Sequence, residues 1–240
     1  MKIKAVFFDL DGTLLPMDQD IFIKAYLGGL AKTLAPKGYE PEAIASALWR
    51  GTADMVKNDG RTTNEEVFWN SFCSILGEDV RKEEPLLEEF YKTDFQKVKN
   101  VCGFAPEARE IVDMLKGAGI TTVLATNPLF PAIATESRMR WAGLEPGDFK
   151  VYTTYENSRF CKPNLMYYKT LLCELNLCGE DCVMVGNDVG EDMIAKNLGM
   201  QVFLLTDNLI NKVNEDISGY RKGSFSDLKK YIEEIINENN

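Results

Sequence analysis

The chain of 240 residues is long enough for one large domain, or for a core with a smaller second domain. With 27 basic and 37 acidic residues it carries a formal net charge of −10, which argues against nucleic acid and anionic membranes as partners. It contains no histidine, which excludes Ser-His and Cys-His nucleophile chemistry and His-ligated zinc sites.

Three further observations concern the cellular compartment. No stretch approaches about 20 uninterrupted apolar residues, so no membrane span is predicted. The first residues lack the basic and apolar regions of a signal peptide, and a cytoplasmic protein is predicted. The six cysteines form no C-x-x-C pair, and in a chain of this length we expect reduced, mostly structural thiols.

The first predicted element is a short strand that contains the apolar run Ala5-Val6-Phe7-Phe8 and ends there. The following segment, residues 16–101, contains helical patterns but no convincing strand. Within it, Thr63 or Asn64 followed by two glutamates is typical of a helix start. We therefore predict a small helical bundle inserted between the first strand and the rest of the chain.

From residue 102 onward, apolar runs typical of buried strands alternate with helical patterns. The predicted elements are a helix at 108–115, a strand at 120–125, a helix at 131–141, a strand at 151–153, a helix at 165–175, a strand at 183–185, a helix at 192–198, a strand at 202–205 and a helix at 225–235. This alternation predicts an α/β fold with a Rossmann-like parallel sheet, covered by helices on both faces. The site is then expected at the carboxyl ends of the strands. The asparagine-rich end, residues 237–240, is predicted to fray.

The most informative motif directly follows the first predicted strand. Asp9 and Asp11 are carboxylates one residue apart, and Gly12 and Thr13 come next. This pattern is typical of a nucleophile, an acid–base group and a metal site within one loop, where the glycine allows a close approach of the backbone. The pattern D-x-D-G-T-L resembles the signature of the haloacid dehalogenase superfamily of phosphotransferases.

Three further motifs occur in the order that this family shows, each after or beside a predicted strand. They are Thr126-Asn127, Lys162-Pro163 and the segment Gly186-Asn187-Asp188-Val189-Gly190-Glu191-Asp192. Each alone has an ordinary structural explanation, such as a loop start, a solvated turn or a charge at a helix terminus. Because all four motifs occur in order, the family resemblance is the better interpretation.

The resemblance implies catalytic roles for both carboxylates of the first motif. Asp9 would be the nucleophile that takes the phosphoryl group, since an acyl phosphate divides hydrolysis into two easier steps. Asp11 would protonate the leaving oxygen and later deprotonate water. Thr126, with help from Asn127, would bind the phosphate oxygens. Lys162 would pair with Asp9 and with the phosphoryl group.

The resemblance also implies a Mg²⁺ site, because oxygen ligands and retained waters suit that ion. The ligands would be Asp9, the backbone carbonyl of Asp11 and the carboxylate of Asp188. The fourth motif departs from the family pattern, in which an acid directly follows the glycine: here Asn187 occupies that place. Asn187 is therefore an alternative ligand through its amide oxygen. Asp192, four residues after Asp188, is a further acid near the metal.

A second departure is the pair Phe160-Cys161 before Lys162, which places apolar and thiol groups beside the site. One interpretation is a thiol whose pKa is lowered by the lysine. The other, which we favour, is a packed sulfur without a chemical role.

We predict that residues 1–15 and 102–240 form the core and that residues 16–101 form a helical cap. In the family, a cap between the first and second motifs is of the C1 type. A movable lid over the site would exclude water and contact the leaving group of the substrate. Such an architecture suits small phosphorylated molecules better than bulky phosphoproteins.

The predicted function is that of a Mg²⁺-dependent phosphatase that hydrolyses a small phosphate monoester through an aspartyl-phosphate intermediate. Two alternatives stay open: a phosphomutase acting on a sugar phosphate, and a catalytically silent binding or regulatory protein with the same fold. A dehalogenase is disfavoured, because that branch of the family lacks the second carboxylate that Asp11 supplies. The predicted partner is a small phosphorylated metabolite, and the sequence identifies neither that metabolite nor an oligomeric state.

Overall fold

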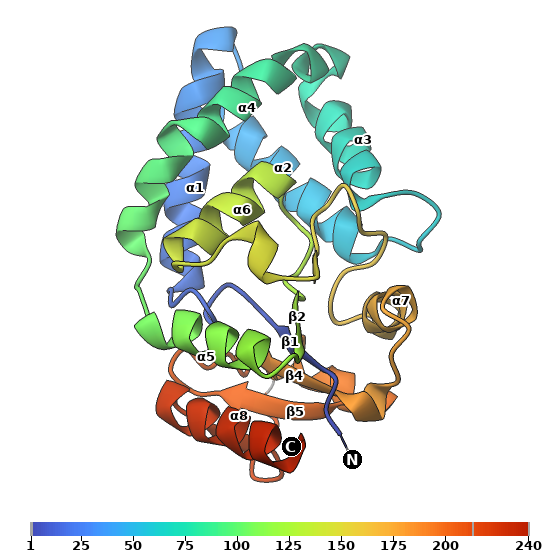
Figure 1. Ribbon diagram of the computed structural model, residues 1–240. Helices are drawn as coiled ribbons and strands as arrows, with labels where there is room; N and C mark the ends of the chain where they lie inside the picture. The colour runs from blue at the N-terminus through green and yellow to red at the C-terminus, as the bar shows by residue number, and fades with distance from the viewer. Residues whose placement is uncertain (1, 213, 240) are drawn as a thin grey trace.

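Figure 1 shows the computed structural model, which describes residues 2–212 and 214–239. Six strands form one sheet in the order β3-β2-β1-β4-β5-β6, and every neighbouring pair is parallel. The strands are β1 (Ala5–Phe8), β2 (Thr121–Leu124), β3 (Val151–Tyr152), β4 (Cys182–Gly186), β5 (Gln201–Leu205) and β6 (Arg221–Gly223). The predicted α/β fold with a parallel, Rossmann-like sheet is confirmed.

Strand β1 is buried on both faces, which explains its uninterrupted apolar sequence. Successive side chains of a strand point to opposite faces, so Phe7 and Phe8 join different hydrophobic clusters. Phe7 packs in the cluster under α7, and Phe8 packs in the cluster under α5 and α8. The core helices are α5 (Pro106–Gly117), α6 (Ala132–Trp141), α7 (Leu165–Glu174) and α8 (Phe225–Asn239), with 3₁₀ turns η4 (Pro146–Asp148) and η5 (Gly179–Asp181).

The central position of β1 determines where the site forms. Phe8, the last residue of β1, is in register with Leu124 of β2 and with Val185 of β4. The first, second and fourth motifs directly follow these three strand ends. They therefore meet at one edge of the sheet, where ligands of parallel α/β sheets bind.

Three details differ from the predicted elements. Residues predicted as a helix at 192–198 form the 3₁₀ helix η6 (Met193–Leu198). Strand β6 was not predicted, because it is three residues long and begins with two basic residues. The predicted fraying of the chain end is wrong: α8 extends to Asn239, whose side chain accepts a hydrogen bond from Ile3 N at 3.0 Å and donates one to Ile3 O at 2.7 Å. Residue 240 lies outside the described residues.

Residues 16–101, hereafter the helical insert, connect β1 to the rest of the core without contributing a strand to the sheet, as predicted. The insert contains α1 (Gln19–Leu34), η1 (Ala35–Lys37), α2 (Pro41–Val56), α3 (Asn64–Leu76), η2 (Glu78–Glu83), α4 (Glu84–Lys92) and η3 (Asp94–Val101). Helix α3 begins at the predicted place with a capping box, in which Thr63 Oγ1 accepts from Glu66 N at 3.2 Å and a Glu66 oxygen accepts from Thr63 N.

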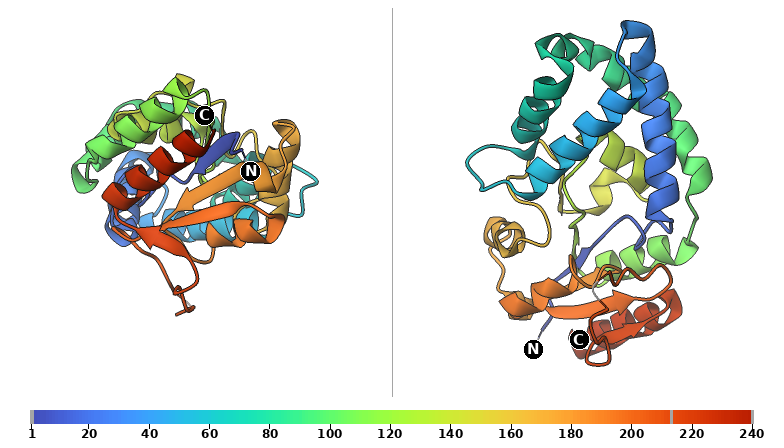
Figure 2. Two further views of the ribbon diagram at one scale, coloured as in Figure 1. Left: turned by 60° about the horizontal axis from the view of Figure 1, so that its bottom comes forward. Right: turned by 180° about the vertical axis from the view of Figure 1, so that it is seen from behind.

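The helical insert lies over the carboxyl edge of the sheet (Figure 2). At its two ends the backbone is paired, with Gly103 N donating to Pro16 O at 2.7 Å. A second attachment lies at the start of α3, where Asn64 N donates to the carbonyl of Ser158 in the core at 2.8 Å. The insert is thus held against the core at two separate places in this structure.

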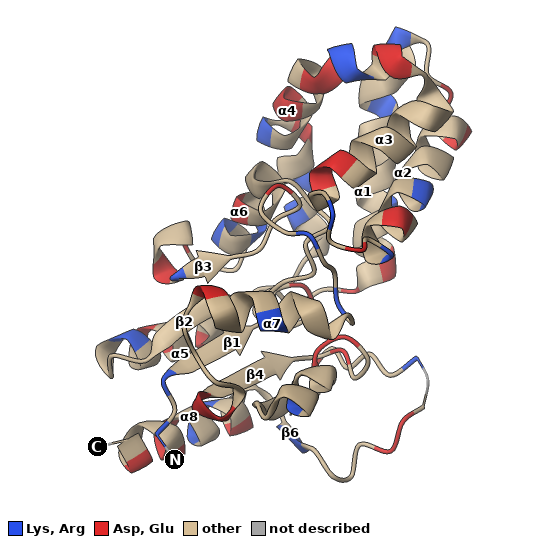
Figure 3. Cartoon of the chain, turned by 90° about the vertical axis from the view of Figure 1, so that its right-hand side faces the viewer, with Lys and Arg blue, Asp and Glu red and all other residues tan. Residues whose placement is uncertain are grey.

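Acidic and basic residues are interspersed along both the insert and the core (Figure 3). In the part of the chain that the structure describes, no helix combines the length and the apolar character needed to cross a membrane. All six cysteines are free thiols, as predicted.

Candidate active site

A cavity of about 130 Å³ lies between the carboxyl edge of the sheet and the beginning of the helical insert. Seven of the eight candidate residues from the sequence line it: Asp9, Asp11, Thr126, Asn127, Asn187, Asp188 and Asp192. The eighth, Lys162, is buried and contacts Asp9 and Asp192. Other wall residues come from the core (Leu129, Phe130, Glu191) and from the insert (Met17, Gln19, Phe22, Ile23). The structure therefore brings the four motifs together.

Asp9 continues the line of β1, because its backbone N–H donates to Val185 O at 2.9 Å. Its side chain is buried and both oxygens have donors. Oδ1 accepts from Lys162 Nζ at 2.9 Å, and Oδ2 accepts from Thr13 Oγ1 at 3.1 Å. The strand and these two contacts fix the direction of the Asp9 carboxylate at the cavity.

Lys162 is 1% exposed, and its ammonium group lies between two carboxylates. Nζ donates to Asp9 Oδ1 and, at 2.6 Å, to Asp192 Oδ1. Burial alone would lower the pKa of Lys162, but Asp192 and Asp9 together raise it well above its usual range. Lys162 is therefore a permanent positive charge beneath the cavity.

The Asp11 side chain faces a buried arginine that sequence reasoning did not identify. Oδ2 accepts a hydrogen bond from Arg138 Nη1, and Oδ1 is buried without any hydrogen-bond partner. Burial raises the pKa of the Asp11 carboxyl, while the Arg138 guanidinium opposes this rise. Asp9 and Asp11 thus have different environments: a lysine and a hydroxyl for the first, an arginine and an orphaned oxygen for the second.

Arg138 belongs to α6 and is fully buried. Its guanidinium lies 4.3 Å from the ring centre of Phe130, and the ring of Phe22, from the insert, lies 6.0 Å away. Arg140, two residues later, is half exposed and pairs with Glu136 at 3.1 Å. Both arginines lie in the same predicted helix, and nothing in the neighbouring sequence shows which of them is buried. Only the tertiary structure distinguishes them.

At two positions, the backbone and neighbouring side chains of the first and fourth motifs lie so close together that only glycine fits. Gly12 has φ of +86°, and a Cβ there would lie 2.3 Å from Asn187 Nδ2, which confirms that the first motif needs close backbone approach. A Cβ on Gly186 would lie 2.1 Å from an Asp192 carboxylate oxygen. The two glycines therefore let the first and fourth motifs pack against each other.

Asn187 and Asp188 occupy different positions in the fourth motif. Asn187 is 1% exposed, and its Oδ1 accepts from Thr13 Oγ1 at 2.9 Å, the same hydroxyl that contacts Asp9. Asp188 Oδ1 accepts from the backbone N–H of Gly190 at 2.8 Å and of Glu191 at 3.0 Å. Asp188 thus uses one oxygen to hold its loop, and both residues line the cavity.

The second motif is anchored by its backbone. The carbonyl of Thr126 accepts from Thr153 Oγ1 at 2.6 Å and from the Tyr167 hydroxyl at 2.8 Å. Asn127 accepts from Lys162 N at 3.2 Å and donates to Glu191 Oε2 at 2.9 Å. Burial raises the pKa of Glu191 to about 7. Glu191 was not singled out from the sequence, although it lies within the fourth motif.

The donor set fits a hard divalent cation. Among residues 2–212 and 214–239, no three carboxylate or thiolate side chains form a ready-made metal cage. Mg²⁺, however, commonly binds through one or two carboxylates and completes its shell with waters and substrate phosphate. The single proton of Thr13 Oγ1 is shared between oxygens of Asp9 and Asn187, so one of these two buried oxygens lacks that donor at any moment. Buried oxygens that lack donors are the groups that a cation satisfies.

Cys161 is buried, and its sulfur accepts from Asn64 Nδ2 at 3.3 Å. Burial raises the pKa of the Cys161 thiol to about 12. The thiol is therefore protonated at neutral pH, which supports the interpretation of a packed sulfur.

A family model described as haloacid dehalogenase-like hydrolase matches residues 3–210. A curated phosphoglycolate phosphatase from Vibrio parahaemolyticus is 25% identical over 210 residues, which cover 85% of this chain and 84% of that protein.

Solved structures also resemble the chain. A HAD phosphatase from Thermococcus onnurineus has a TM-score of 0.59 at 21% identity, covering 96% of this chain and 98% of that one. CbbY from Rhodobacter sphaeroides, crystallised with phosphate, has a TM-score of 0.58 at 19% identity, covering 94% of this chain and 96% of that one. At these identities the two structures show a shared fold, insert included.

Proposed function

The chain belongs to the family of haloacid dehalogenase-like hydrolases, and from this premise we propose that it is a Mg²⁺-dependent phosphatase acting on a small phosphate monoester. One observation carries the proposal: the carboxylate of Asp9, held by Lys162 and Thr13, faces the same small cavity as Asp11. A fixed nucleophile and a second carboxyl group in a different environment are what two-step hydrolysis requires. The phosphatase names of the relatives are consistent with it.

In the proposed first step, an oxygen of Asp9 attacks phosphorus and the bond from phosphorus to the leaving oxygen breaks. Asp11 gives its proton to that leaving oxygen, so the product is a neutral alcohol. In the second step, water attacks the aspartyl phosphate, Asp11 takes the proton of that water, and inorganic phosphate leaves. Asp9 and Asp11 then return to their starting states.

The remaining residues position and neutralise the phosphoryl group. We assign its binding to Thr126, Asn127 and Lys162, because phosphoryl transfer depends mainly on positioning and on charge stabilisation. A bound Mg²⁺ would withdraw charge from the phosphoryl oxygens. Its proposed ligands are Asp9, the carbonyl of Asp11 and Asp188.

We further propose that residues 1–15 and 102–240 act as the catalytic core and that the helical insert acts as the cap. Cap residues such as Phe22 and Ile23 line the cavity opposite the core carboxylates. An insert in this place can exclude water from the aspartyl phosphate and can contact the leaving group.

The metal assignment makes a first prediction. Excess chelator abolishes hydrolysis of an aryl phosphate, and Mg²⁺ restores it, whereas Zn²⁺ serves poorly because the chain offers no histidine. Asp188→Ala raises the Mg²⁺ concentration for half-maximal rate by about tenfold or more, a loss of ~1.4 kcal/mol of binding, and Asn187→Ala raises it less. The measurement is a Mg²⁺ titration of the initial rate.

Two outcomes of that titration would count against the assignment. Full activity in excess chelator contradicts a metal-dependent mechanism. A larger effect of Asn187→Ala than of Asp188→Ala would transfer the metal ligand to Asn187. A separate assay with a sugar phosphate tests the alternatives: release of an isomerised sugar phosphate without inorganic phosphate would favour the phosphomutase, and absence of turnover of either substrate would favour the silent binding protein.

A second prediction concerns Arg138 as a positioning residue for Asp11. Arg138→Met lowers kcat about tenfold to a hundredfold, ~1.4 to 2.7 kcal/mol of barrier, because the leaving-group acid loses its fixed orientation. Removal of the positive charge also favours the protonated form of Asp11, so its pKa rises. The alkaline limb of the kcat/KM profile therefore moves to higher pH.

The matched control is Arg140→Met, which removes an exposed arginine from the same helix and leaves both kcat and the pH profile unchanged. Arg138→Lys restores part of the rate and of the profile. If Arg138→Met lowers stability but leaves the pH profile of wild type, Arg138 has a structural role only.

A further inference from the structure

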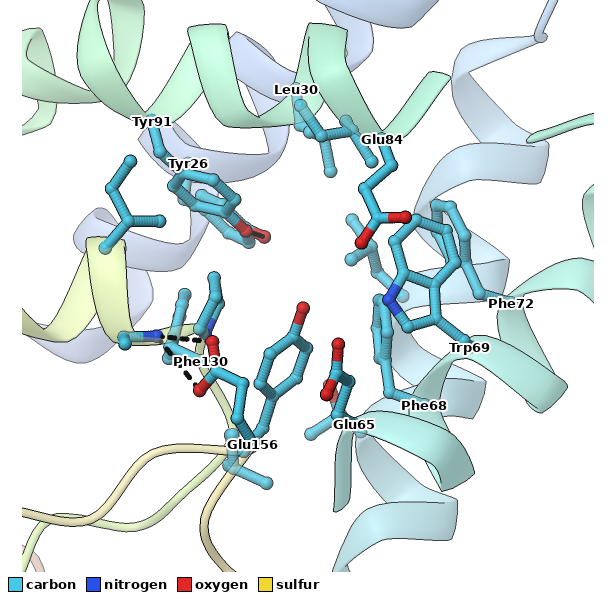
Figure 4. A pocket seen from close by; sticks show the side chains of 18 of the residues that line it. Tyr26, Leu30, Glu65, Phe68, Trp69, Phe72, Glu84, Tyr91, Phe130 and Glu156 are labelled. Atoms are coloured by element: carbon cyan, nitrogen blue, oxygen red, sulfur yellow. Dashed lines mark hydrogen bonds between the residues drawn. The ribbon is translucent and has the colours of Figure 1, made fainter. Parts of the chain in front are cut away.

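A second and larger cavity, about 500 Å³, lies inside the helical insert and against the segment that leads into α6 (Figure 4). Ile23, Leu129 and Phe130 line both this cavity and the active-site cavity. The two spaces therefore adjoin at these three side chains, and a phosphate monoester that occupies both passes between them. A volume of this size is typical of small-molecule pockets, which span about 300–1,000 Å³.

The walls of the cavity are mainly aromatic and aliphatic. Eight aromatic residues line it: Tyr26, Trp49, Phe68, Trp69, Phe72, Tyr91, Phe130 and Tyr155. Several of them pack face to face or edge to face with each other, for example Phe68 and Phe72 with ring centres 5.1 Å apart. The negative faces of aromatic rings attract cations as well as apolar groups.

The charged groups of the lining are all acidic. Four glutamates line the cavity, Glu65, Glu84, Glu88 and Glu156, and none of the described lysines and arginines does. Figure 4 shows the carboxylates of Glu65, Glu84 and Glu156 turned toward the hollow. Burial raises the pKa of Glu65 and the Glu156 carboxylate raises it further, whereas Arg81, which stacks on the ring of Trp69 at 4.4 Å, opposes the rise. The carboxylates that line the cavity outnumber this one nearby cation.

Local structure accounts for some of these carboxylates but not for all. The oxygens of Glu156 accept from Ala132 N at 2.9 and 3.1 Å, at the start of α6. Glu88 is paired with Lys92 at 3.6 Å. Glu84 lies in the first turn of α4 and is paired with Arg81 at 3.8 Å, with both side chains partly exposed. Glu65 lies in the first turn of α3, where the helix dipole favours an acid, but that preference does not require it to face a cavity.

An independent observation points to a ligand. The indole of Trp69 is 4% exposed, and its Nε1 has no hydrogen-bond partner. Figure 4 shows Nε1 directed into the hollow. A buried donor without an acceptor is costly, and a ligand oxygen in the cavity would satisfy it.

We propose that this cavity binds the leaving group of the substrate and that this leaving group is an organic cation: an alcohol with an apolar body and an ammonium group. The ammonium group faces Glu65 and Glu84, and the apolar body packs on the aromatic walls. The oxygen bonded to phosphorus stays beside Asp11, so the acceptor for Trp69 Nε1 is a second oxygen on the apolar body. The inference rests on the proposed phosphatase function, and it names the class of phosphate monoester that the enzyme selects.

The same charges reject anionic leaving groups. The relative from Vibrio parahaemolyticus is named a phosphoglycolate phosphatase, and glycolate carries a carboxylate. In this chain, such a carboxylate would enter a hollow lined by glutamates with no lysine or arginine in the described lining. Like charges in a partly desolvated space repel each other, so the chain selects a different substrate class from that relative.

The test compares para-substituted phenyl phosphates that differ mainly in charge: the cationic aminomethyl, the neutral ethyl and the anionic carboxymethyl compound. We expect kcat/KM to fall by about tenfold from the first to the second, and by a further tenfold to the third. The double variant Glu65→Gln/Glu84→Gln keeps the shape of both side chains and removes their charge. In it, each of the two differences in kcat/KM falls to less than about threefold. Glu89→Gln, an exposed change on α4, keeps the wild-type order.

Calorimetric titration separates failure of the inference from failure of the proposed function. The probes are para-(aminomethyl)phenol and para-hydroxyphenylacetate, which need no turnover to bind. Binding of the amine alone, weakened in the double variant, supports the inference even if no phosphate is hydrolysed. Hydrolysis of all three phosphates at equal kcat/KM, or binding of the acid in preference to the amine, overturns the inference and leaves the phosphatase assignment intact.

Discussion

Asp9→Asn lowers kcat for an aryl phosphate by at least about a thousandfold, which corresponds to ~4 kcal/mol of barrier. The reason is chemical: an amide oxygen does not form a stable acyl phosphate, and so the two-step route closes. The fold is retained, because the amide oxygen can accept from Lys162 and the amide nitrogen can donate to Thr13 Oγ1. The measurement is single-turnover hydrolysis together with thermal unfolding.

The control for Asp9→Asn is the same change at the surface. Asp79 has a side chain that is 82% exposed, and Asp79→Asn keeps the wild-type rate. A kcat for Asp9→Asn above about a tenth of wild type would exclude Asp9 as the nucleophile. Trapping of a phosphorylated wild-type chain that Asp9→Asn does not form would identify the intermediate directly.

The sheet, and the position of the site at its carboxyl edge, could be predicted because each strand is marked by a short, continuous apolar run in the sequence. An uninterrupted apolar run such as Ala5–Phe8 requires burial on both faces, and only a parallel sheet covered by helices provides it. Once the strands are parallel, residues that follow different strands meet at one edge. Asp9 and Asn187 are far apart in the chain, yet Thr13 contacts both.

Arg138 could not be predicted in the same way. Its partner Asp11 is 127 positions away, and a helical pattern does not state which of two nearby arginines faces inward. The hydrophobic surroundings of α6 do not favour an arginine over Met139, which is equally buried. The contact follows from how α6 lies beside the loop of the first motif, and no local rule describes that packing.

The cavity of the insert was also beyond sequence reasoning. Residues such as Phe68 and Phe72 follow a helical pattern that predicts a packed core equally well. Glu65 has an ordinary local role in the first turn of its helix. Only the arrangement of α1, α2, α3 and α4 around the segment before α6 leaves a cavity between them, and its glutamates come from α3, α4 and the loop at Glu156.

Lys162→Met lowers the free energy of unfolding by about 3–5 kcal/mol, because it leaves buried carboxylates without their positive partner. Lys162 is 1% exposed and donates to Asp9 at 2.9 Å and to Asp192 at 2.6 Å. The exposed ion pair of Lys97 with Asp94 is the control, and Lys97→Met leaves stability nearly unchanged. Denaturant unfolding of the three proteins measures the effect.

Stability and catalysis are then separated by a second substitution. Lys162→Met/Asp192→Asn removes one positive and one negative charge together, so the local charge returns to its wild-type sum and we expect half or more of the lost stability to be recovered. Its turnover stays at least about a hundredfold below wild type, because the charge that pairs with Asp9 and with the phosphoryl group is missing. If turnover recovers in step with stability, Lys162 serves only to neutralise buried carboxylates, and its assignment to the phosphoryl group is wrong.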